Sequence, residues 1–328
     1  MAKRYVKQGQ VQCRPSLVTG STPTLFTPQK ISTMILLTGA TGFLGSRLLT
    51  HLLQRGEQVV AIKRSTSSTA KIANDLSHPA LHLFNIDLED PRHLFEEYRV
   101  DIIIHTATDY GRDPSTLHSI LNANLMLPIR LAELGLQQGI RCFINTDSYF
   151  NKRGNSYSNL LNYSLSKKSL LIWLGKLAGK LGIINVVLEH LYGPGDSPYK
   201  FVEHVIRKVG IEQVQHVALT HGHQRRDFIF LDDVVSAYLH LVDYARSQVL
   251  RFETFELGTG QSIQVRDFVD QVKSSSGSLT ELGYGDIPYR LDEMMSSHAD
   301  ISRLESLGWR PTVFVEEGIG RIISNYRT

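Results

Sequence analysis

The pattern of hydrophobic and polar positions changes at Met34. Before it, residues 1–33 are polar and rich in Pro, Thr and Ser, and they have no sustained periodicity. A segment of this composition cannot bury enough apolar surface to fold, so we expect residues 1–33 to be a disordered leader. Met34, which opens the first apolar run, is a second candidate for the start of the native chain.

From Met34 onward, short apolar runs alternate with segments of helical spacing. The apolar runs predict strands, at 34–39, 58–64, 81–87, 100–107, 141–146 and 184–193, and the helical spacing predicts helices, at 43–56, 116–139 and 163–182. This alternation predicts an α/β fold built on a doubly wound parallel sheet of the Rossmann type. After Tyr192 the rhythm weakens, which indicates a smaller C-terminal lobe over the carboxyl edge of the sheet.

A glycine loop follows the first predicted strand and opens the first predicted helix. In "TGATGFLG" the glycines have the spacing G-x-x-G-x-x-G. In this context glycines let backbone N–H groups approach a pyrophosphate at the helix N-terminus. The alternative is a tight turn that binds nothing. We favour a dinucleotide site, whose expected loop contacts are Gly39, Thr41, Gly42, Phe43, Leu44 and Gly45.

The end of the second predicted strand bears on the choice between NAD and NADP. A carboxylate there would accept hydrogen bonds from the ribose hydroxyls of NAD, but the strand ends in Lys63 and Arg64. Two cations can pair with the 2′-phosphate of NADP, so we expect NADP(H) rather than NAD(H). The alternative is a solvated strand end. Asp87, after the third predicted strand, would accept from the adenine amino group, or it is a plain turn aspartate.

Three tyrosines, Tyr149, Tyr157 and Tyr163, follow the fifth predicted strand. Proton exchange with a carbinol or ketone calls for a phenol of lowered pKa, and a lysine four residues further along a helix can stabilise the phenolate. Of the three, Tyr163 has a lysine at that spacing, Lys167. We therefore expect Tyr163 and Lys167 to be catalytic.

Length and composition narrow the class of protein. The chain has 328 residues, of which 42% are hydrophobic, and its net charge is +3. This balance favours neither nucleic acid nor a membrane as partner. Two distant cysteines fit a reducing cytoplasm, where we expect the protein, and the histidines show no metal spacing. We expect residues 34–190 to form the NAD(P)-binding domain and residues 191–328 mainly a substrate-binding lobe, with room for one element that returns to the sheet.

Several of these segments together resemble the extended short-chain dehydrogenase/reductase family, the NAD(P)-dependent nucleotide-sugar epimerases, dehydratases and reductases. The resemblance runs from Met34 to about Arg321, through "TGATGFLG", "HTAT", "NTDS", "YSLSK", "LEHLYGPGD" and "RRDFIFLDDVVSAYL". Within the family the chain resembles the bacterial CDP-3,6-dideoxyhexose 4-reductases, the abequose and paratose synthases. That narrower match rests on "NTDSYF", "LEHLYGPGD", "RDFIFLDDVV" and "MMSSHADISRLESLGW".

The resemblance implies roles for further residues. Thr146 would hydrogen-bond the reacting oxygen of the sugar, and Lys167 would also hold the nicotinamide ribose. His190 stands where many relatives have an asparagine that touches the substrate diphosphate, and this departure weakens the transfer of that role. The further cofactor contacts expected are Thr106, Ala107 and His190, and the substrate contacts expected are Asn124, Asp147, Ser148, Arg226 and Arg290.

For the two arginines, the family role is to grip the nucleotide phosphates, and guanidinium groups suit phosphate oxygens. The alternative for Arg226 and Arg290 is a surface ion pair. Asn124 would be a structural asparagine near the active site. Asp232 and Asp233 are expected to provide a helix N-cap and a structural hydrogen bond rather than catalysis.

The string Thr146-Asp147-Ser148 bears on the reaction. Dehydratases of the family have Thr-Asp-Glu here, and a serine cannot replace a carboxylate that removes a carbon-bound proton. An epimerase usually retains NAD, whereas a reductase commonly consumes NADPH. Because Lys63 and Arg64 favour NADPH, the choice turns to a reductase. We expect NADPH-dependent reduction of the C4 carbonyl of a CDP-linked deoxy-4-ketohexose, in dideoxysugar biosynthesis of the O-antigen type. The alternatives are an NAD-dependent nucleotide-sugar epimerase and a non-catalytic NADP-sensing regulator of the same fold.

The predicted helix at 163–182 has apolar residues on more than one face. One face must lie on the sheet to place Tyr163, and the remaining apolar surface needs another cover. The resemblance implies a homodimer through the helices that start near Thr116 and Tyr163. The alternative is that the C-terminal lobe covers this surface within one chain.

Overall fold

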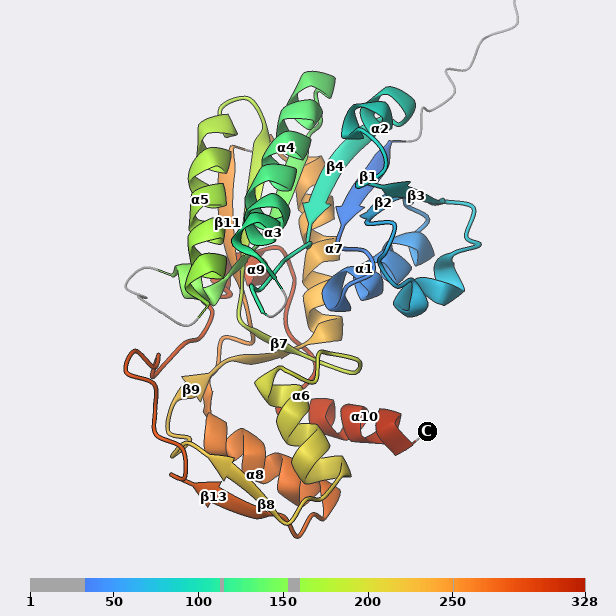
Figure 1. Ribbon diagram of the computed structural model, residues 1–328. Helices are drawn as coiled ribbons and strands as arrows, with labels where there is room; N and C mark the ends of the chain where they lie inside the picture. Colours follow the sequence, from blue (N-terminus) through green and yellow to red (C-terminus); the bar gives the residue numbers. More distant parts are fainter. Residues whose placement is uncertain (1–32, 113–114, 153–159, 250, 328) are drawn as a thin grey trace, which may run out of the picture. The chain divides into compact units, whose positions relative to one another are not determined.

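The computed structural model describes residues 33–112, 115–152, 160–249 and 251–327. Its centre is a seven-stranded sheet in the order β11-β6-β5-β4-β1-β2-β3 (Figure 1), and every pairing in it is parallel. The strands are β1 (Met34–Thr38), β2 (Gln58–Lys63), β3 (Leu81–Asn85), β4 (Val100–His105), β5 (Cys142–Ser148), β6 (Gly182–Leu188) and β11 (Phe252–Leu257). The predicted doubly wound parallel sheet is confirmed. The predicted leader, apart from Thr33, lies outside the described residues.

Helices cover both faces of the sheet, because the apolar strands present side chains alternately to each side. On one face α1 (Phe43–Gln54) and α7 (Leu231–Ser247) share a core with strand residues such as Ile35 and Ile144. On the other face α2 (Pro91–Glu97), α4 (Leu127–Gln138) and α5 (Leu161–Leu177) pack on residues such as Leu36 and Phe143. The chain after residue 190 returns to this half of the molecule with α7, with strand β11 and with α9 (Ser302–Ser306).

The C-terminal lobe has a separate core, below the sheet in Figure 1. Its helices are α6 (Phe201–Val205), the π-helical η4 (Ile206–Ile211), α8 (Val265–Ser276) and α10 (Val315–Arg327). Its strands are β7 (His190–Tyr192), β8 (His216–Leu219), β9 (Arg225–Arg226), β10 (Phe228–Phe230), β12 (Ile263–Gln264) and β13 (Glu281–Tyr284), which pair in twos. Two of the connections to the sheet half run through β7 and β10, which pair with each other in parallel.

Two predicted elements are divided in the structure. The helix predicted at 116–139 begins at a capping box on Thr116 and runs through α3 (Leu117–Leu121), the π-helical η2 (Asn122–Met126) and α4. The strand predicted at 184–193 breaks at Glu189, where β6 leaves the sheet and β7 turns to pair with β10. The prediction of a single strand is wrong because both parts are apolar, and periodicity cannot show that they belong to different sheets. Among the described residues before Tyr192, three short helices were not predicted: α2, η1 (Ala70–Asp75) and η3 (Tyr149–Asn151).

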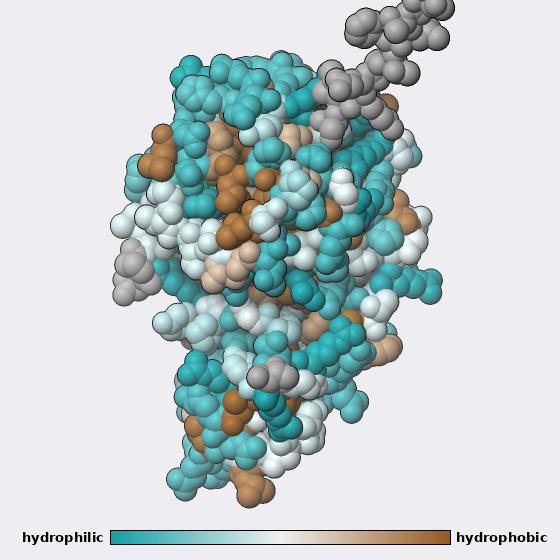
Figure 2. Space-filling view, turned by 90° about the vertical axis from the view of Figure 1, so that its right-hand side faces the viewer, coloured by the Kyte–Doolittle hydropathy of each residue, from teal (hydrophilic) through white to brown (hydrophobic). Residues whose placement is uncertain are grey.

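The outer surface is mostly hydrophilic on the face shown in Figure 2, where hydrophobic side chains gather mainly over the upper half. No helix of the described residues is long and apolar enough to cross a membrane. Helix α5 has apolar residues on two faces, as its sequence predicts. Leu170 and Leu174 are buried on the sheet, whereas Leu165, Ile172 and Trp173 are exposed.

Candidate active site

A cleft of about 1960 Å³ opens at the carboxyl edge of the sheet and continues into the C-terminal lobe. In doubly wound sheets ligands bind at this edge, where the strand order reverses, which here is between β1 and β4. Pockets for one small ligand are commonly about 300–1,000 Å³. The cleft therefore has room for two large ligands side by side.

The glycine loop forms one end of the cleft, and its glycines are required by close packing. Gly39 has a φ of +72°, and a Cβ on it would lie 2.7 Å from the backbone N of Ala107. A Cβ on Gly45 would lie 2.1 Å from the carbonyl oxygen of Gly39. Helix α1 begins directly after Gly42, with no side-chain cap on its first N–H groups. These uncapped donors fit a pyrophosphate, as the sequence predicts.

The other loop residues expected at the cofactor also line the cleft: Thr41, Phe43, Leu44, Thr106 and Ala107. Thr106 Oγ1 donates to the carbonyl oxygen of Thr38 at 2.8 Å, which holds the end of β4 against the end of β1. The crevice between these two strands is thus fixed before any ligand enters it.

Lys63 and Arg64 line the cleft at the end of β2. Neither forms a salt bridge with a described residue, and Lys63 Nζ donates to the carbonyl oxygen of Arg64 at 3.1 Å. Asp87 accepts from Ser65 through its backbone N at 2.7 Å and its Oγ at 2.6 Å. Asp87 thus holds the loop after β2, as a turn aspartate would, and its contact with adenine stays a prediction. Lys63 also helps to lower the pKa of Asp87, and the contact of either cation with a phosphate stays a prediction.

Tyr163 and Lys167 are brought to the centre of the cleft region by the first turns of α5. Tyr163 lines the cleft and is 5% exposed, whereas Lys167 is 1% exposed and its Nζ donates to the carbonyl oxygen of Thr146 at 2.8 Å. Burial lowers the pKa of Lys167 to about 8. Both side chains therefore lie next to the end of β5, but the ammonium group of Lys167 donates to the backbone of Thr146.

The expectation that Tyr163 has a lowered pKa is wrong for this structure. Burial raises the pKa of Tyr163 well above its usual value, nearby Tyr110 raises it further, and a hydrogen bond with Ser148 opposes the rise. The tyrosine is therefore fully protonated over the physiological range. A group that must donate a proton needs this form.

Thr146, Asp147 and Ser148 all line the cleft from the end of β5. The carboxylate of Asp147 is fully engaged: Oδ1 accepts from Asn151 Nδ2 at 2.6 Å and from Ser148 N at 2.8 Å, and Oδ2 accepts from Asn185 Nδ2 at 3.1 Å. Burial raises the pKa of Asp147, and the hydrogen bonds from these donors oppose the rise. The carboxylate thus holds the end of β5, and its contact with substrate stays a prediction.

Asn124 is fully buried and does not line the cleft. It lies in the π-helical segment η2, where its amide bonds both backbone groups of Asp109 and the hydroxyl of Ser166, at 2.7–3.0 Å. The widened helical turn thus ties the loop after β4 to helix α5. These buried hydrogen bonds fit a structural asparagine, and the expected contact of Asn124 with the substrate stays a prediction.

At the lobe end, His190, Arg226 and Arg290 line the cleft. Arg226 is 6% exposed, and its guanidinium forms an ion pair with Glu293 at 2.5 Å. The alternative of an ion pair is thus present, but it is buried within the cleft rather than on the surface. An incoming phosphate would compete with Glu293 for the same guanidinium, and the phosphate roles of both arginines stay predictions.

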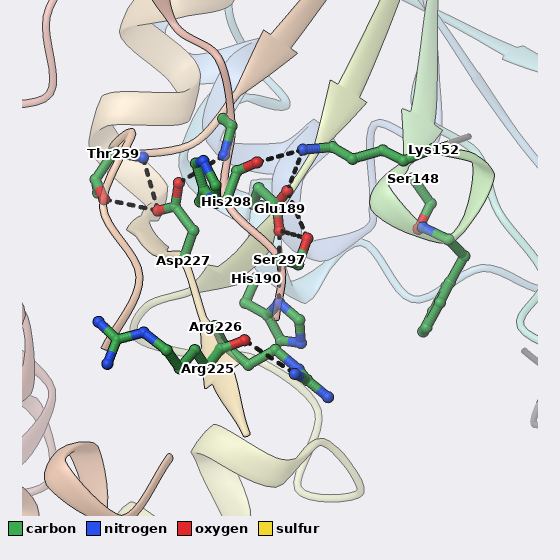
Figure 3. A network of polar contacts seen from close by, with 12 residues as sticks. Ser148, Lys152, Glu189, His190, Arg225, Arg226, Asp227, Thr259, Ser297 and His298 are labelled. Atoms are coloured by element: carbon green, nitrogen blue, oxygen red, sulfur yellow. Dashed lines mark hydrogen bonds and ion pairs between the residues drawn. The ribbon is translucent and has the colours of Figure 1, made fainter. Parts of the chain in front are cut away.

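His190 adjoins a buried polar network (Figure 3). Glu189 Oε1 accepts from Lys152 Nζ at 2.5 Å, and the Ser297 hydroxyl lies 2.8 Å from each carboxylate oxygen. Burial lowers the pKa of His190, although the neighbouring Glu189 acts in the opposite direction. The imidazole is therefore neutral at physiological pH, and the network fixes the break between β6 and β7 beside it.

The expectation of an N-cap at Asp232 or Asp233 is wrong, because α7 begins after Phe230 and both aspartates lie in its first turn. Asp232 pairs with Arg47 and Arg321. Asp233 accepts from Thr312 and Val313, so it makes structural hydrogen bonds. In the described part of the chain, no group of three or more His, Cys, Asp or Glu side chains could hold a metal ion.

Several cleft residues are absent from the sequence-based set. The ring of Tyr110 lies 5.1 Å from that of Tyr163, and the ammonium of Lys200 lies 5.2 Å from the ring of Phe43. Both come from loops without a spacing signal. Glu189 had such a signal, since it is a charged residue within an apolar run.

The fold and the cleft define a dinucleotide-binding enzyme, and the chain belongs to the NAD dependent epimerase/dehydratase family, whose model matches residues 35–258. The predicted family is thereby confirmed, as is an NAD(P)-dependent enzyme of the extended short-chain dehydrogenase/reductase type.

Individual relatives are similar to this chain over about nine-tenths of its length. The CDP-abequose synthase of Salmonella muenchen is 34% identical over 299 residues, which cover 90% of this chain and 98% of that protein. A UDP-glucose 4-epimerase of Mycolicibacterium smegmatis is 26% identical, with 89% and 98% covered. The solved structure of UDP-glucose-4-epimerase from Stenotrophomonas maltophila with bound NAD is similar in fold, with a TM-score of 0.78, 20% identity, and 90% and 98% of the two chains covered.

Proposed function

We propose that this protein is an NADPH-dependent nucleotide-sugar 4-ketoreductase that acts on a CDP-linked deoxy-4-ketohexose in dideoxysugar biosynthesis of the O-antigen type. The observation that carries this proposal is the similarity to the CDP-abequose synthase of Salmonella muenchen, which extends over 90% of this chain and 98% of that protein. Reduction adds a hydride to the carbonyl carbon and a proton to the oxygen, and yields an alcohol.

The proton chemistry of the cleft supports reduction. Tyr163 lines the cleft and retains its proton because burial raises its pKa, and in this proposal it transfers that proton to the oxygen. When bound, the reduced nicotinamide supplies the hydride. Lys167, whose pKa is lowered to about 8, would hold the nicotinamide ribose and place a positive charge beside Tyr163.

The chemistry of a 4,6-dehydratase is disfavoured at the end of β5. That reaction needs a base to remove a carbon-bound proton, and position 148 is a serine whose hydroxyl bonds Tyr163. The adjacent Asp147 has hydrogen-bond donors on both oxygens. These donors hold the Asp147 carboxylate in place, although burial raises its pKa. With a serine at position 148, the site favours a reaction that needs Tyr163 as its proton donor.

NADP(H) as the cofactor is supported by the residues at the glycine-loop end of the cleft. The uncapped N-terminus of α1 would bind a pyrophosphate, and Lys63 and Arg64 lie in the same cleft without salt-bridge partners among the described residues. A 2′-phosphate placed between them would gain charge-assisted hydrogen bonds. NADP(H) is therefore the cofactor that we propose, within the NAD(P) dependence that the family has.

A second candidate is an NAD-dependent nucleotide-sugar epimerase. It is favoured by the similarity to the UDP-glucose 4-epimerase of Mycolicibacterium smegmatis and by the fold shared with an epimerase that binds NAD. The two candidates differ in their net redox change, since an epimerase returns its cofactor to the starting state after each turnover.

We also infer a homodimer and a cytoplasmic location. Exposed apolar side chains gather on α3, η2 and α5: Leu117, Leu121, Met126, Leu161, Leu165, Ile172 and Trp173. A second copy of the chain would cover this face by a two-fold contact. A cytoplasmic location fits a substrate and cofactor that are made in that compartment.

The deciding experiment supplies the full chain with NADPH and a panel of nucleotide-linked 4-keto-6-deoxysugars, with cytidine, uridine or thymidine as the nucleoside, and follows NADPH absorbance. Stoichiometric consumption of NADPH with the CDP-linked ketone supports the proposal. Interconversion of two nucleotide sugars without net NADPH consumption would establish the epimerase instead. NADPH binding without turnover of any of them would point to a regulator.

A further inference from the structure

Tyr238 has a hydroxyl that reaches the end of β5 from the opposite face to Tyr163. It belongs to helix α7, which packs with α1, whereas Tyr163 comes from α5 on the other face. Tyr238 is fully buried, and its hydroxyl lies 2.6 Å from Thr146 Oγ1. A residue 92 positions further along the chain thus contacts a side chain that lines the cleft.

The direction of this hydrogen bond follows from the chemistry of the two hydroxyls. Each has one hydrogen to donate. Among the described residues, Thr146 Oγ1 is the hydrogen-bond partner of the Tyr238 hydroxyl. Burial also raises the pKa of Tyr238, so the phenol keeps its hydrogen. Either hydroxyl can donate at this distance. A buried O–H without an acceptor is costly, which favours the arrangement in which Tyr238 donates and Thr146 accepts.

This arrangement leaves the hydrogen of the Thr146 hydroxyl for a ligand. Thr146 is 9% exposed, and it lines the same cleft as Tyr163. Its backbone is held as well, because its carbonyl oxygen accepts from Lys167 Nζ. The side chain is thus fixed from one face and the backbone from the other. A hydroxyl that already accepts a hydrogen bond is also a stronger donor to an oxygen on which negative charge develops.

We propose that Tyr238 is a positioning residue for hydride transfer, which fixes Thr146 as a hydrogen-bond donor to the reacting oxygen of the substrate. Tyr238 exchanges no proton in this role. The proton that enters or leaves the oxygen belongs to Tyr163, and the Tyr238–Thr146 pair lowers the energy of the partly charged oxygen. The same pair serves reduction of a carbonyl and oxidation of an alcohol, because both pass through that oxygen. The inference therefore rests on the enzyme class and on the position of Thr146, and not on the direction of the proposed reaction.

The test is a double-mutant cycle with Tyr238→Phe, Thr146→Val and the double variant. Hydride transfer is measured as NADPH consumption with the CDP-linked ketone and as nicotinamide reduction with nucleotide-linked 4-hydroxy sugars. We expect Tyr238→Phe to lower kcat roughly 10- to 100-fold, with KM and NADPH affinity nearly unchanged. In the Thr146→Val background, Tyr238→Phe should have almost no further effect on kcat, because the group that it positions is gone.

Matched variants separate positioning from folding. Tyr244→Phe removes a hydroxyl from the same helix, away from β5, and should leave kcat unchanged. If Tyr238→Phe does not fold, replacement of Tyr238 by 4-fluorophenylalanine fills the volume of the hydroxyl but cannot donate. Independent effects of the two substitutions on kcat, or an unchanged kcat in Tyr238→Phe, would overturn the inference. A wild-type protein that only interconverts nucleotide sugars would contradict the proposed reduction, yet the same cycle on nicotinamide reduction would still decide the role of Tyr238.

Discussion

Replacement of Tyr163 by phenylalanine removes one hydroxyl and keeps the ring. The ring is 5% exposed and lies against Tyr110, at a centroid distance of 5.1 Å, and against Phe150, at 6.3 Å. Phenylalanine preserves these contacts. The change therefore deletes the proton donor with little disturbance to the packing around it.

Two energies can be compared for this variant. The lost hydrogen bond with Ser148 changes folding stability by about 1 kcal/mol. A positioned general acid contributes about 10²–10⁴-fold to a rate, which corresponds to roughly 3–5 kcal/mol in the activation free energy. The effect on turnover should therefore exceed the effect on stability several-fold, so that one measurement cannot be mistaken for the other.

Turnover is measured by NADPH absorbance with the CDP-linked ketone, NADPH binding by fluorescence titration, and stability by thermal unfolding. We expect kcat to fall by roughly 10²-fold or more, with NADPH affinity and unfolding temperature nearly unchanged. Tyr149→Phe serves as the comparison, because Tyr149 also lines the cleft. Near-normal turnover of Tyr163→Phe would refute the assignment. It would point to Tyr149, or to Tyr157, which lies outside the described residues.

Three further outcomes are expected. Replacement of both Lys63 and Arg64 by alanine should weaken NADPH binding by on the order of 1–3 kcal/mol per side chain and leave NADH binding little affected. Titrations with both cofactors measure this difference. Equal losses of affinity for NADPH and NADH would instead favour the NAD-dependent epimerase. Trp173→Glu should convert a dimer to a monomer in light scattering, because Trp173 is 56% exposed on the proposed interface; a wild-type protein that stays at the mass of one chain at high concentration would exclude that interface. Burial depresses the pKa of Lys167 from 10.5 to about 8, so above pH 8 the unfolded state binds more protons than the folded state. Stability relative to Lys167→Met should therefore rise by up to about 1.4 kcal/mol per pH unit until about pH 10.5. Denaturant titrations at several pH values that show this difference falling as pH rises would contradict the depressed pKa of the buried Lys167.

The glycine loop at one end of the cleft could be predicted because its signals are local. The glycine spacing, the adjacent apolar strand and the following helix lie within one short segment, and backbone geometry there leaves few alternatives to glycine. Gly39 and Gly45 illustrate this, since a Cβ at either position would overlap neighbouring backbone atoms. The Tyr163–Lys167 spacing was equally local, although it did not show where the ammonium points. That direction depends on the carbonyl oxygen of Thr146, which another element supplies.

The sequence by itself determined the class of fold, the order of strands and helices in its first half, and the residues of the glycine loop, because periodicity and steric demand act over a few neighbouring positions. The tertiary structure decided what depends on neighbours distant in the chain. The buried surroundings raise the pKa of Tyr163 rather than lower it. Pairing of β7 with β10 breaks the predicted sixth strand at Glu189. Tyr238 reaches Thr146 from 92 positions away, on the other face of the sheet. No local pattern encodes such contacts, since burial and hydrogen-bond partners are set only when the layers pack together.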